Sequence, residues 1–204
     1  MKINKKKFIY LISPNKISKN FYKNLDLIFK TGKVSFFQLR LKKYSLEEKF
    51  KIGKKIKNIC RKNKVKFLIN DDPYLALKLN ADGCHLGQKD MDISFVKKIL
   101  DKKIIGITCH NSIKLAKKAI KSKASYLAFG AFFNSKTKKT KYVASTNILN
   151  KVKKFTNTPL VAIGGINSDN YKNLLLNNAN FLAISGYIWK NKKYKPFEAI
   201  EELK

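Results

Sequence analysis

Short apolar runs alternate with longer amphipathic stretches from one end of this 204-residue chain to the other. The apolar runs are rich in β-branched and aromatic residues, and they predict eight strands at residues 8–13, 34–40, 66–71, 83–86, 104–108, 126–130, 160–164 and 181–185. The stretches between them predict helices at residues 16–29, 46–63, 73–80, 92–100, 111–123, 146–155, 168–178 and 194–203. The strands are continuously apolar, which indicates a parallel sheet covered by helices.

Eight such units within 204 residues predict a compact (β/α)8 TIM barrel, formed as a single domain over residues 1–204 with its core at about residues 8–203. An open, doubly wound sheet is the alternative, although that fold usually stops at five or six strands. Several predicted helices have capping residues at their starts, namely Ser45, the pair Asn111-Ser112, and the run Asn167-Ser168-Asp169.

The three cysteines, Cys60, Cys84 and Cys109, are odd in number and widely spaced. This spacing matches no paired metal motif and no disulfide framework, so we expect buried, reduced thiols. No apolar run approaches the roughly 18–20 residues that a membrane span needs. The basic and apolar start lacks a small-residue cleavage site, so we interpret it as a first strand and expect a cytoplasmic protein.

The net charge of +32 suggests a partner that carries negative charge, such as nucleic acid. However, Arg40 and Arg61 are the only arginines, and the lysines are spread over every predicted helix. Selection for phosphate or base readout usually favours arginine. We therefore expect a solvated lysine surface without specific nucleic-acid binding, and keep a polyanion-binding protein as a rival hypothesis from another functional class.

In a barrel of this kind the active site gathers at the carboxyl ends of the strands. Five of the chain's eight aspartates fall between residues 71 and 92, around the ends of the third and fourth predicted strands. We predict that Asp71 and Asp90 flank one Mg²⁺ ion, because paired carboxylates can hold Mg²⁺ while phosphate oxygens and water complete its shell. Asp72 is interpreted as a helix cap, and Asp82 and Asp92 as structural residues.

The second predicted strand ends in Gln38-Leu39-Arg40-Leu41-Lys42, and its alternation places Gln38, Arg40 and Lys42 on one side. A guanidinium in a lysine-rich chain indicates bidentate phosphate binding at this end. Asn70 is expected to join the metal or diphosphate site. His85 is more readily interpreted as a satisfied core histidine than as a catalytic one. Thr108 could offer a hydroxyl to the barrel mouth, and His110 is equally well placed to start the next helix.

Segments after the last three predicted strands also indicate anion binding. The hydroxyl-rich, cationic run after the sixth strand, Asn134 to Lys141, resembles a lid that closes over an anion, with a solvated lysine loop as the alternative. Gly164-Gly165 and Ser185-Gly186 follow the last two strands, where barrels commonly bind phosphate through backbone N–H groups. The sequence therefore presents two anion sites: a Mg²⁺, arginine and lysine site on the second to sixth strands, and a backbone site on the seventh and eighth. Two such sites imply two phosphorylated substrates.

Taken in order, these segments resemble the thiamine-phosphate synthase family. The resemblance runs from about residue 8 to 190 and rests on the segments QLRLK (38–42), ND (70–71), HLGQKD (85–90), GITCH (106–110), FG and SKTK (129–130 and 135–138) and AIGGI (162–166). Thr108 stands where the family more often has serine, and Ser135 where it has threonine. Ala131 and Asn134 stand where prolines are common.

The resemblance implies a TIM-barrel transferase with Mg²⁺ as cofactor, which joins a pyrimidine diphosphate to a thiazole phosphate and releases diphosphate. Asp71 and Asp90 would bind the metal, and Arg40, Thr108 and Lys138 would be catalytic. The implied substrate-binding residues are Gln38, Leu39, Arg40, Leu41, Lys42, Asn70, Thr108, Ser135, Lys136, Thr137, Lys138, Gly165, Ile184 and Ser185.

The implied mechanism is dissociative and needs no protein nucleophile: the cations stabilise the leaving diphosphate, and the thiazole nitrogen attacks a pyrimidinyl-methylene cation. A rival within the fold is the related thiazole tautomerase, a cofactor-free isomerase. It would need an acid or base such as His110 and would not need the Asp71/Asp90 pair. No membrane partner is expected, and barrels of this type often associate into homo-oligomers.

Overall fold

The computed structural model describes residues 7–134 and 143–204. Eight parallel strands close into a barrel in which every strand pairs with its neighbours in sequence and β8 pairs back onto β1. They are β1 (Ile9–Ile12), β2 (Val34–Leu39), β3 (Lys66–Asn70), β4 (Gly83–Leu86), β5 (Ile104–His110), β6 (Tyr126–Gly130), β7 (Leu160–Ile163) and β8 (Phe181–Ile184). The predicted (β/α)8 barrel is confirmed, and the open-sheet alternative is wrong because the sheet closes.

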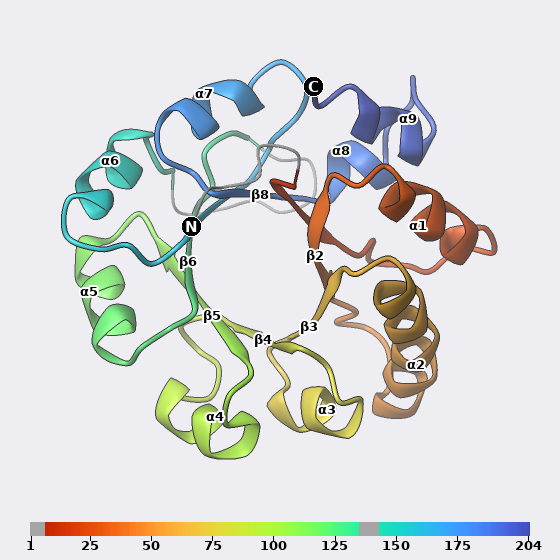
Figure 1. Ribbon diagram of the computed structural model, residues 1–204, viewed down its shortest axis with the longest axis horizontal. Coiled ribbons are helices and arrows are strands. Elements are labelled where there is room, and N and C mark those ends of the chain that lie inside the picture. The colour runs from red at the N-terminus through yellow and green to blue at the C-terminus, as the bar shows by residue number, and fades with distance from the viewer. Residues whose placement is uncertain (1–6, 135–142) are drawn as a thin grey trace.

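The helices form an outer ring around the strands (Figure 1). They are α1 (Phe21–Lys30), α2 (Leu46–Lys62), α3 (Pro73–Lys78), α4 (Ile93–Leu100), α5 (Ile113–Lys121), α6 (Asn147–Lys153), α7 (Tyr171–Leu176), α8 (Gly186–Trp189) and α9 (Pro196–Glu201). Each of these helices is too short or too polar to cross a bilayer, within the described residues.

Local sequence explains several helix starts. The Ser45 hydroxyl accepts a hydrogen bond from the Glu48 N–H, and the Glu48 carboxylate accepts one from the Ser45 N–H, which forms a complete capping box. Asp72 caps α3 by accepting from the Leu75 N–H at 2.9 Å, as predicted. Ser112 caps α5 in the same way, which leaves His110 as the last residue of β5 rather than a helix start.

Two apolar layers hold the barrel together. The larger one lies between the strands and the helices and includes Leu11, Phe37 and Phe67, all at most 1% exposed. The smaller one fills the barrel interior and includes Tyr10, Leu68 and Tyr126. Full burial of a large apolar side chain contributes about 1.5–3 kcal/mol each, so these layers dominate the stability of the closed barrel.

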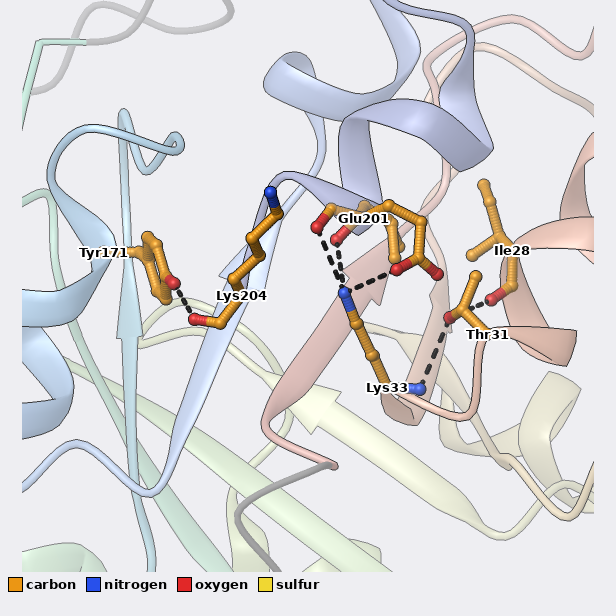
Figure 2. A network of polar contacts seen from close by, with 7 residues as sticks. Ile28, Thr31, Lys33, Tyr171, Glu201 and Lys204 are labelled. Atoms are coloured by element: carbon orange, nitrogen blue, oxygen red, sulfur yellow. Dashed lines mark hydrogen bonds and ion pairs between the residues drawn. The ribbon is translucent and has the colours of Figure 1, made fainter.

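Polar contacts hold α9 and the residues after it against the neighbouring elements (Figure 2). Lys33, in the turn before β2, donates to the main-chain oxygen of Glu201 and forms an ion pair with its carboxylate at 2.8 Å. Tyr171 of α7 donates its hydroxyl hydrogen to the Lys204 main-chain oxygen. These contacts fasten α9 to the turn before β2, and the residue Lys204 after it to α7.

Several predicted boundaries are wrong by a few residues. The first helix begins at Phe21 rather than residue 16, and the seventh begins at Tyr171 because Asn167 and Asn170 form a preceding turn. The last helix spans only Pro196–Glu201, and β5 continues two residues further than predicted. The short helix α8 was not predicted at all.

Candidate active site at the carboxyl ends of the strands

Asp71 and Asp90 lie together at the mouth of the barrel, as the sequence predicts. Asp71 directly follows β3, and its N–H donates to the His85 oxygen on β4 at 2.8 Å. Asp90 lies in the loop after β4, where its carboxylate accepts from the Gly87 N–H at 2.6 Å. Burial raises the pKa of the Asp71 carboxyl, and the adjacent Asp90 carboxyl raises it further. A partly buried carboxylate in contact with a second one favours a bound cation.

The remaining aspartates of this stretch have structural partners. Asp82 precedes β4 at the opposite end of the barrel, where it accepts from the Phe67 N–H at 2.9 Å and pairs with Lys66. Asp92 caps α4 through the Ser94 N–H. The described part of the chain holds no cluster of three or more His, Cys, Asp or Glu that could bind a metal ion. Of the five aspartates in this stretch, Asp71 and Asp90 therefore stay the predicted pair for a cation.

Asp71 has a left-handed backbone, with φ at +64°. This conformation is uncommon for a residue with a side chain and costs on the order of 1–2 kcal/mol. It lets the chain turn sharply out of β3 into the α3 cap at Asp72. His110, at the end of β5, has a similar φ of +53°. Uncommon backbone conformations therefore lie at two strand ends on the side where the carboxylates meet.

Two basic residues, Arg40 and Lys42, lie at the end of β2. The Lys42 ammonium lies 3.6 Å from the Asp71 carboxylate. The backbone of Arg40 is held by Ser13 of the β1 end, whose buried hydroxyl accepts from the Arg40 N–H at 2.9 Å and donates to the Arg40 oxygen at 3.3 Å. Ser13 was not predicted. Its own carbonyl accepts from the Ser185 hydroxyl at 3.2 Å, so one residue links the ends of β2 and β8.

A cavity of about 450 Å³ lies beside Asp71, at the ends of β2 and β3. Its wall includes Lys42, Asn70 and Asp71, together with Tyr74 and Met91. Leu39 and Leu41 also line it, although both belong mainly to the apolar layer under the helices. The cavity is therefore lined by charged and polar side chains together with apolar ones.

A chain of polar side chains crosses the barrel interior below the mouth. Gln38 donates its amide N–H to the Tyr10 hydroxyl at 2.8 Å, and the Tyr10 hydroxyl lies 2.7 Å from that of Tyr126. The Tyr126 hydroxyl lies 2.8 Å from Nδ1 of His85, and Nε2 of His85 lies 2.8 Å from the Thr108 hydroxyl. Both ring nitrogens of His85 are thus satisfied, as its interpretation as a core histidine requires.

Burial sets the charge of these groups. It lowers the pKa of His85 to about 4 and raises the pKa of Tyr10 far above its ordinary value. Burial also raises the pKa of Tyr126 well above 10. All three side chains are therefore neutral near pH 7. Gln38 and Thr108, both predicted at the barrel mouth, are the first and last side chains of this hydrogen-bonded series.

The end of β7 comes close to the segment after β6. The Phe133 N–H donates to the Gly164 oxygen at 3.1 Å, and a Cβ on Gly165 would lie 2.6 Å from the Asn134 oxygen. Gly165 also has φ at +66°, so both space and backbone require glycine there. Ile184 is 2% exposed, so its side chain packs into the outer layer and only its backbone is available at the strand end. Ser135, Lys136, Thr137 and Lys138 lie outside the described residues.

The three cysteines are buried and free, as predicted. Burial raises the pKa of Cys109 to about 12 and moves the pKa values of Cys60 and Cys84 far above their ordinary range. Because the thiolate is the reactive form, none of the three is poised as a nucleophile near neutral pH.

Comparisons with known proteins agree with this geometry. A family model described as thiamine monophosphate synthase matches residues 9–188. The chain is 68% identical over the full length of both proteins to a thiamine-phosphate synthase from Pelagibacter ubique. It is 37% identical to one from Erythrobacter litoralis, over 95% of this chain and 93% of that protein.

Among solved structures, a thiamine phosphate pyrophosphorylase from Pyrococcus furiosus superposes with a TM-score of 0.86 at 30% identity, covering 98% of this chain and 94% of that one. These relatives indicate a transferase. The chain therefore belongs to the thiamine monophosphate synthase family.

Proposed function

We propose that this protein condenses 4-amino-2-methyl-5-pyrimidinylmethyl diphosphate with a 4-methyl-5-(2-phosphoethyl)thiazole, or its carboxylated form, to give thiamine phosphate and diphosphate. The observation that carries the proposal is the contact between Asp71 and Asp90 at the barrel mouth, next to Lys42. A thiazole tautomerase, which releases no diphosphate, would not need this pair. Family membership supplies the thiazole and pyrimidine chemistry.

Asp71 and Asp90 would hold Mg²⁺. Burial, and then the neighbouring Asp90 carboxyl, raise the pKa of Asp71, and a divalent cation held by both carboxylates would stabilise its ionised form. Two protein carboxylates also suit Mg²⁺, which usually keeps several waters or takes substrate phosphate oxygens. When bound, the ion would neutralise charge that develops on the diphosphate.

Cationic and amide side chains would complete the diphosphate site. Arg40 offers a bidentate guanidinium, with its backbone fixed by Ser13, and Lys42 and Asn70 lie on the cavity wall. Lys138, outside the described residues, is proposed to complete the set. These groups would stabilise the diphosphate more strongly as its charge increases in the transition state.

Bond breaking would precede bond making. The methylene C–O bond breaks, its electron pair leaves with diphosphate, and the aminopyrimidine delocalises the resulting positive charge. The thiazole nitrogen then supplies the pair for the new C–N bond. The protein would position both rings, with Gln38 and Thr108 at the pyrimidine. The inert thiols fit this route because it requires no covalent intermediate with the protein.

The thiazole phosphate would bind at the ends of β7 and β8. Gly165 and Ile184 would contribute backbone groups, and Ser185 a hydroxyl. Ser135, Lys136 and Thr137 would approach from the segment after β6. Phe133 and Asn134, which precede Ser135 in the sequence, pack on Gly164 and Gly165, and this packing supports the proposed arrangement.

The proposal is tested by incubating the purified protein with both substrates and Mg²⁺, and measuring thiamine phosphate and diphosphate in parallel. We expect equal amounts of the two products, and none when either substrate is omitted. Isomerisation of a thiazole without diphosphate release would support the tautomerase instead. Binding of polyanions without any turnover would support the polyanion-binding hypothesis.

A further inference from the structure

The hydrogen-bond chain inside the barrel has one direction that satisfies every member. Gln38 presents its amide N–H to Tyr10, so the Tyr10 oxygen accepts there. The hydroxyl hydrogen of Tyr10 must then go to Tyr126, because Tyr126 is the other hydrogen-bond partner that the described residues give it. The hydrogen of Tyr126 in turn goes to Nδ1 of His85.

The opposite direction leaves a buried donor unpaired. If Nδ1 of His85 carried a hydrogen, Tyr126 would accept it and would donate its own hydrogen to Tyr10. Tyr10 would then accept from both Tyr126 and Gln38, and its hydroxyl hydrogen would have no acceptor among the described residues. Tyr10 is 1% exposed and Tyr126 is 3% exposed, so bulk water would not compensate for that loss.

A glycine makes room for this arrangement. A Cβ on Gly106 of β5 would lie 1.8 Å from the ring of Tyr126. With glycine there, the Tyr126 ring can extend into the barrel and stack on His85, with a centroid distance of 5.7 Å and an interplanar angle of 15°. Gly106 pairs with His85 on one side and with Tyr126 on the other. The strand register therefore places all three residues at one level of the barrel.

We propose that Tyr10, Tyr126 and His85 are positioning residues that hold His85 as its neutral Nε2–H tautomer and orient the Thr108 hydroxyl as a hydrogen-bond donor towards the mouth. Since Nε2–H of His85 donates to the Thr108 oxygen, the Thr108 hydrogen is available for another acceptor. The chemical group that suits it is an unprotonated ring nitrogen, as in an aminopyrimidine. This role for Thr108 rests on the proposed function, whereas the tautomer follows from the protein alone.

The tautomer can be measured directly by nitrogen-15 NMR of the imidazole rings near pH 7, in the full chain without substrate. The chain contains two histidines, His85 and His110, so a His110→Gln variant assigns the remaining signals. We expect His85 to show a protonated Nε2 and an unprotonated Nδ1. A protonated Nδ1, with or without a protonated Nε2, would overturn the proposal.

Kinetics test the positioning role. Tyr126→Phe should lower kcat/KM for the pyrimidine diphosphate at least tenfold while leaving KM for the thiazole phosphate within twofold. Tyr171→Phe is the matched control, because it also removes one tyrosine hydroxyl bond but on the outside of the barrel, and it should leave both values unchanged. Wild-type kinetics for Tyr126→Phe, or an equal loss for both substrates, would contradict the role.

Thr108 provides a second comparison. Thr108→Ser keeps the hydroxyl and should retain most activity, whereas Thr108→Val keeps the shape and should lose it. Equal activity of the two variants would overturn the donor role. Absence of any condensation by the wild-type protein would refute the proposed function instead, since the NMR result does not depend on turnover.

Discussion

Replacing Ser13 by alanine tests how the mouth of the barrel is held together. The Ser13 hydroxyl is buried, accepts from the Arg40 N–H at 2.9 Å and donates to the Arg40 oxygen at 3.3 Å. Ser13→Ala would leave the Arg40 N–H without this acceptor, which costs about 1–3 kcal/mol when the group stays away from water. For a chain of this length, a loss of about 2 kcal/mol lowers Tm by about 4–8 °C.

The same change should affect catalysis through the position of Arg40. A displacement of about 1 Å in a group that positions substrate can cost on the order of 10²-fold in rate. We expect kcat/KM for the pyrimidine diphosphate to fall by about tenfold or more, mainly through the position of the guanidinium. Thermal unfolding followed by circular dichroism and steady-state diphosphate release measure the two effects.

Ser35→Ala is the matched control for this experiment. The Ser35 hydroxyl donates to the Lys7 oxygen at 2.7 Å, at the opposite end of the barrel from the site. Its loss should reduce stability by about 0.5–1.5 kcal/mol without changing kcat/KM. A Ser13→Ala protein that unfolds at the wild-type Tm, or that loses stability but keeps wild-type kinetics, would show that Ser13 does not position Arg40.

Three further outcomes follow from the geometry. Gly106→Ala should destabilise the protein by about 1–3 kcal/mol or more, because its Cβ would overlap the Tyr126 ring, and a wild-type urea midpoint would contradict this. Burial lowers the pKa of His85 to about 4, so as pH falls the imidazole takes up a proton in the unfolded chain before it does so in the folded one. The free energy of unfolding should therefore decrease from about pH 6.5 towards pH 4, and urea titrations of His85→Gln should show a smaller decrease. Mg²⁺ at about 100 times its Kd should stabilise the protein by about 2.7 kcal/mol, and Asp90→Asn should abolish the accompanying rise in Tm while Asp92→Asn retains it.

The alternation of apolar and amphipathic runs was sufficient to predict the barrel. Each strand could be recognised from its own residues alone. Eight consecutive βα units in so short a chain then favour one topology, the closed parallel barrel. Boundaries were less predictable where side chains make turns of their own, as Asn167 and Asn170 do before α7. The four residues of α8 are too few to show a helical period, so Ser185-Gly186 was interpreted only as a loop.

The Asp71/Asp90 contact was predictable because consecutive strands of a barrel are neighbours, so their carboxyl ends meet. The interior chain was not, since Tyr10 and Tyr126 are 116 residues apart and no local pattern pairs them. A signal was nevertheless present: tyrosines within otherwise apolar strands need hydrogen-bond partners for their hydroxyls. Ser13 was missed for a similar reason, because its two contacts lie 27 and 172 residues away.

The central claim is that paired carboxylates at the mouth serve a metal-assisted departure of diphosphate. The most direct measurement is the initial rate of diphosphate release, with both substrates present, for the wild type, Asp71→Asn, Asp90→Asn and the neighbouring Asp92→Asn, each with Mg²⁺ and with a chelator. We expect release to require Mg²⁺, to fall by at least tenfold in Asp71→Asn and Asp90→Asn, and to be unchanged in Asp92→Asn. Undiminished release in the chelator, or in both mouth variants, would contradict it.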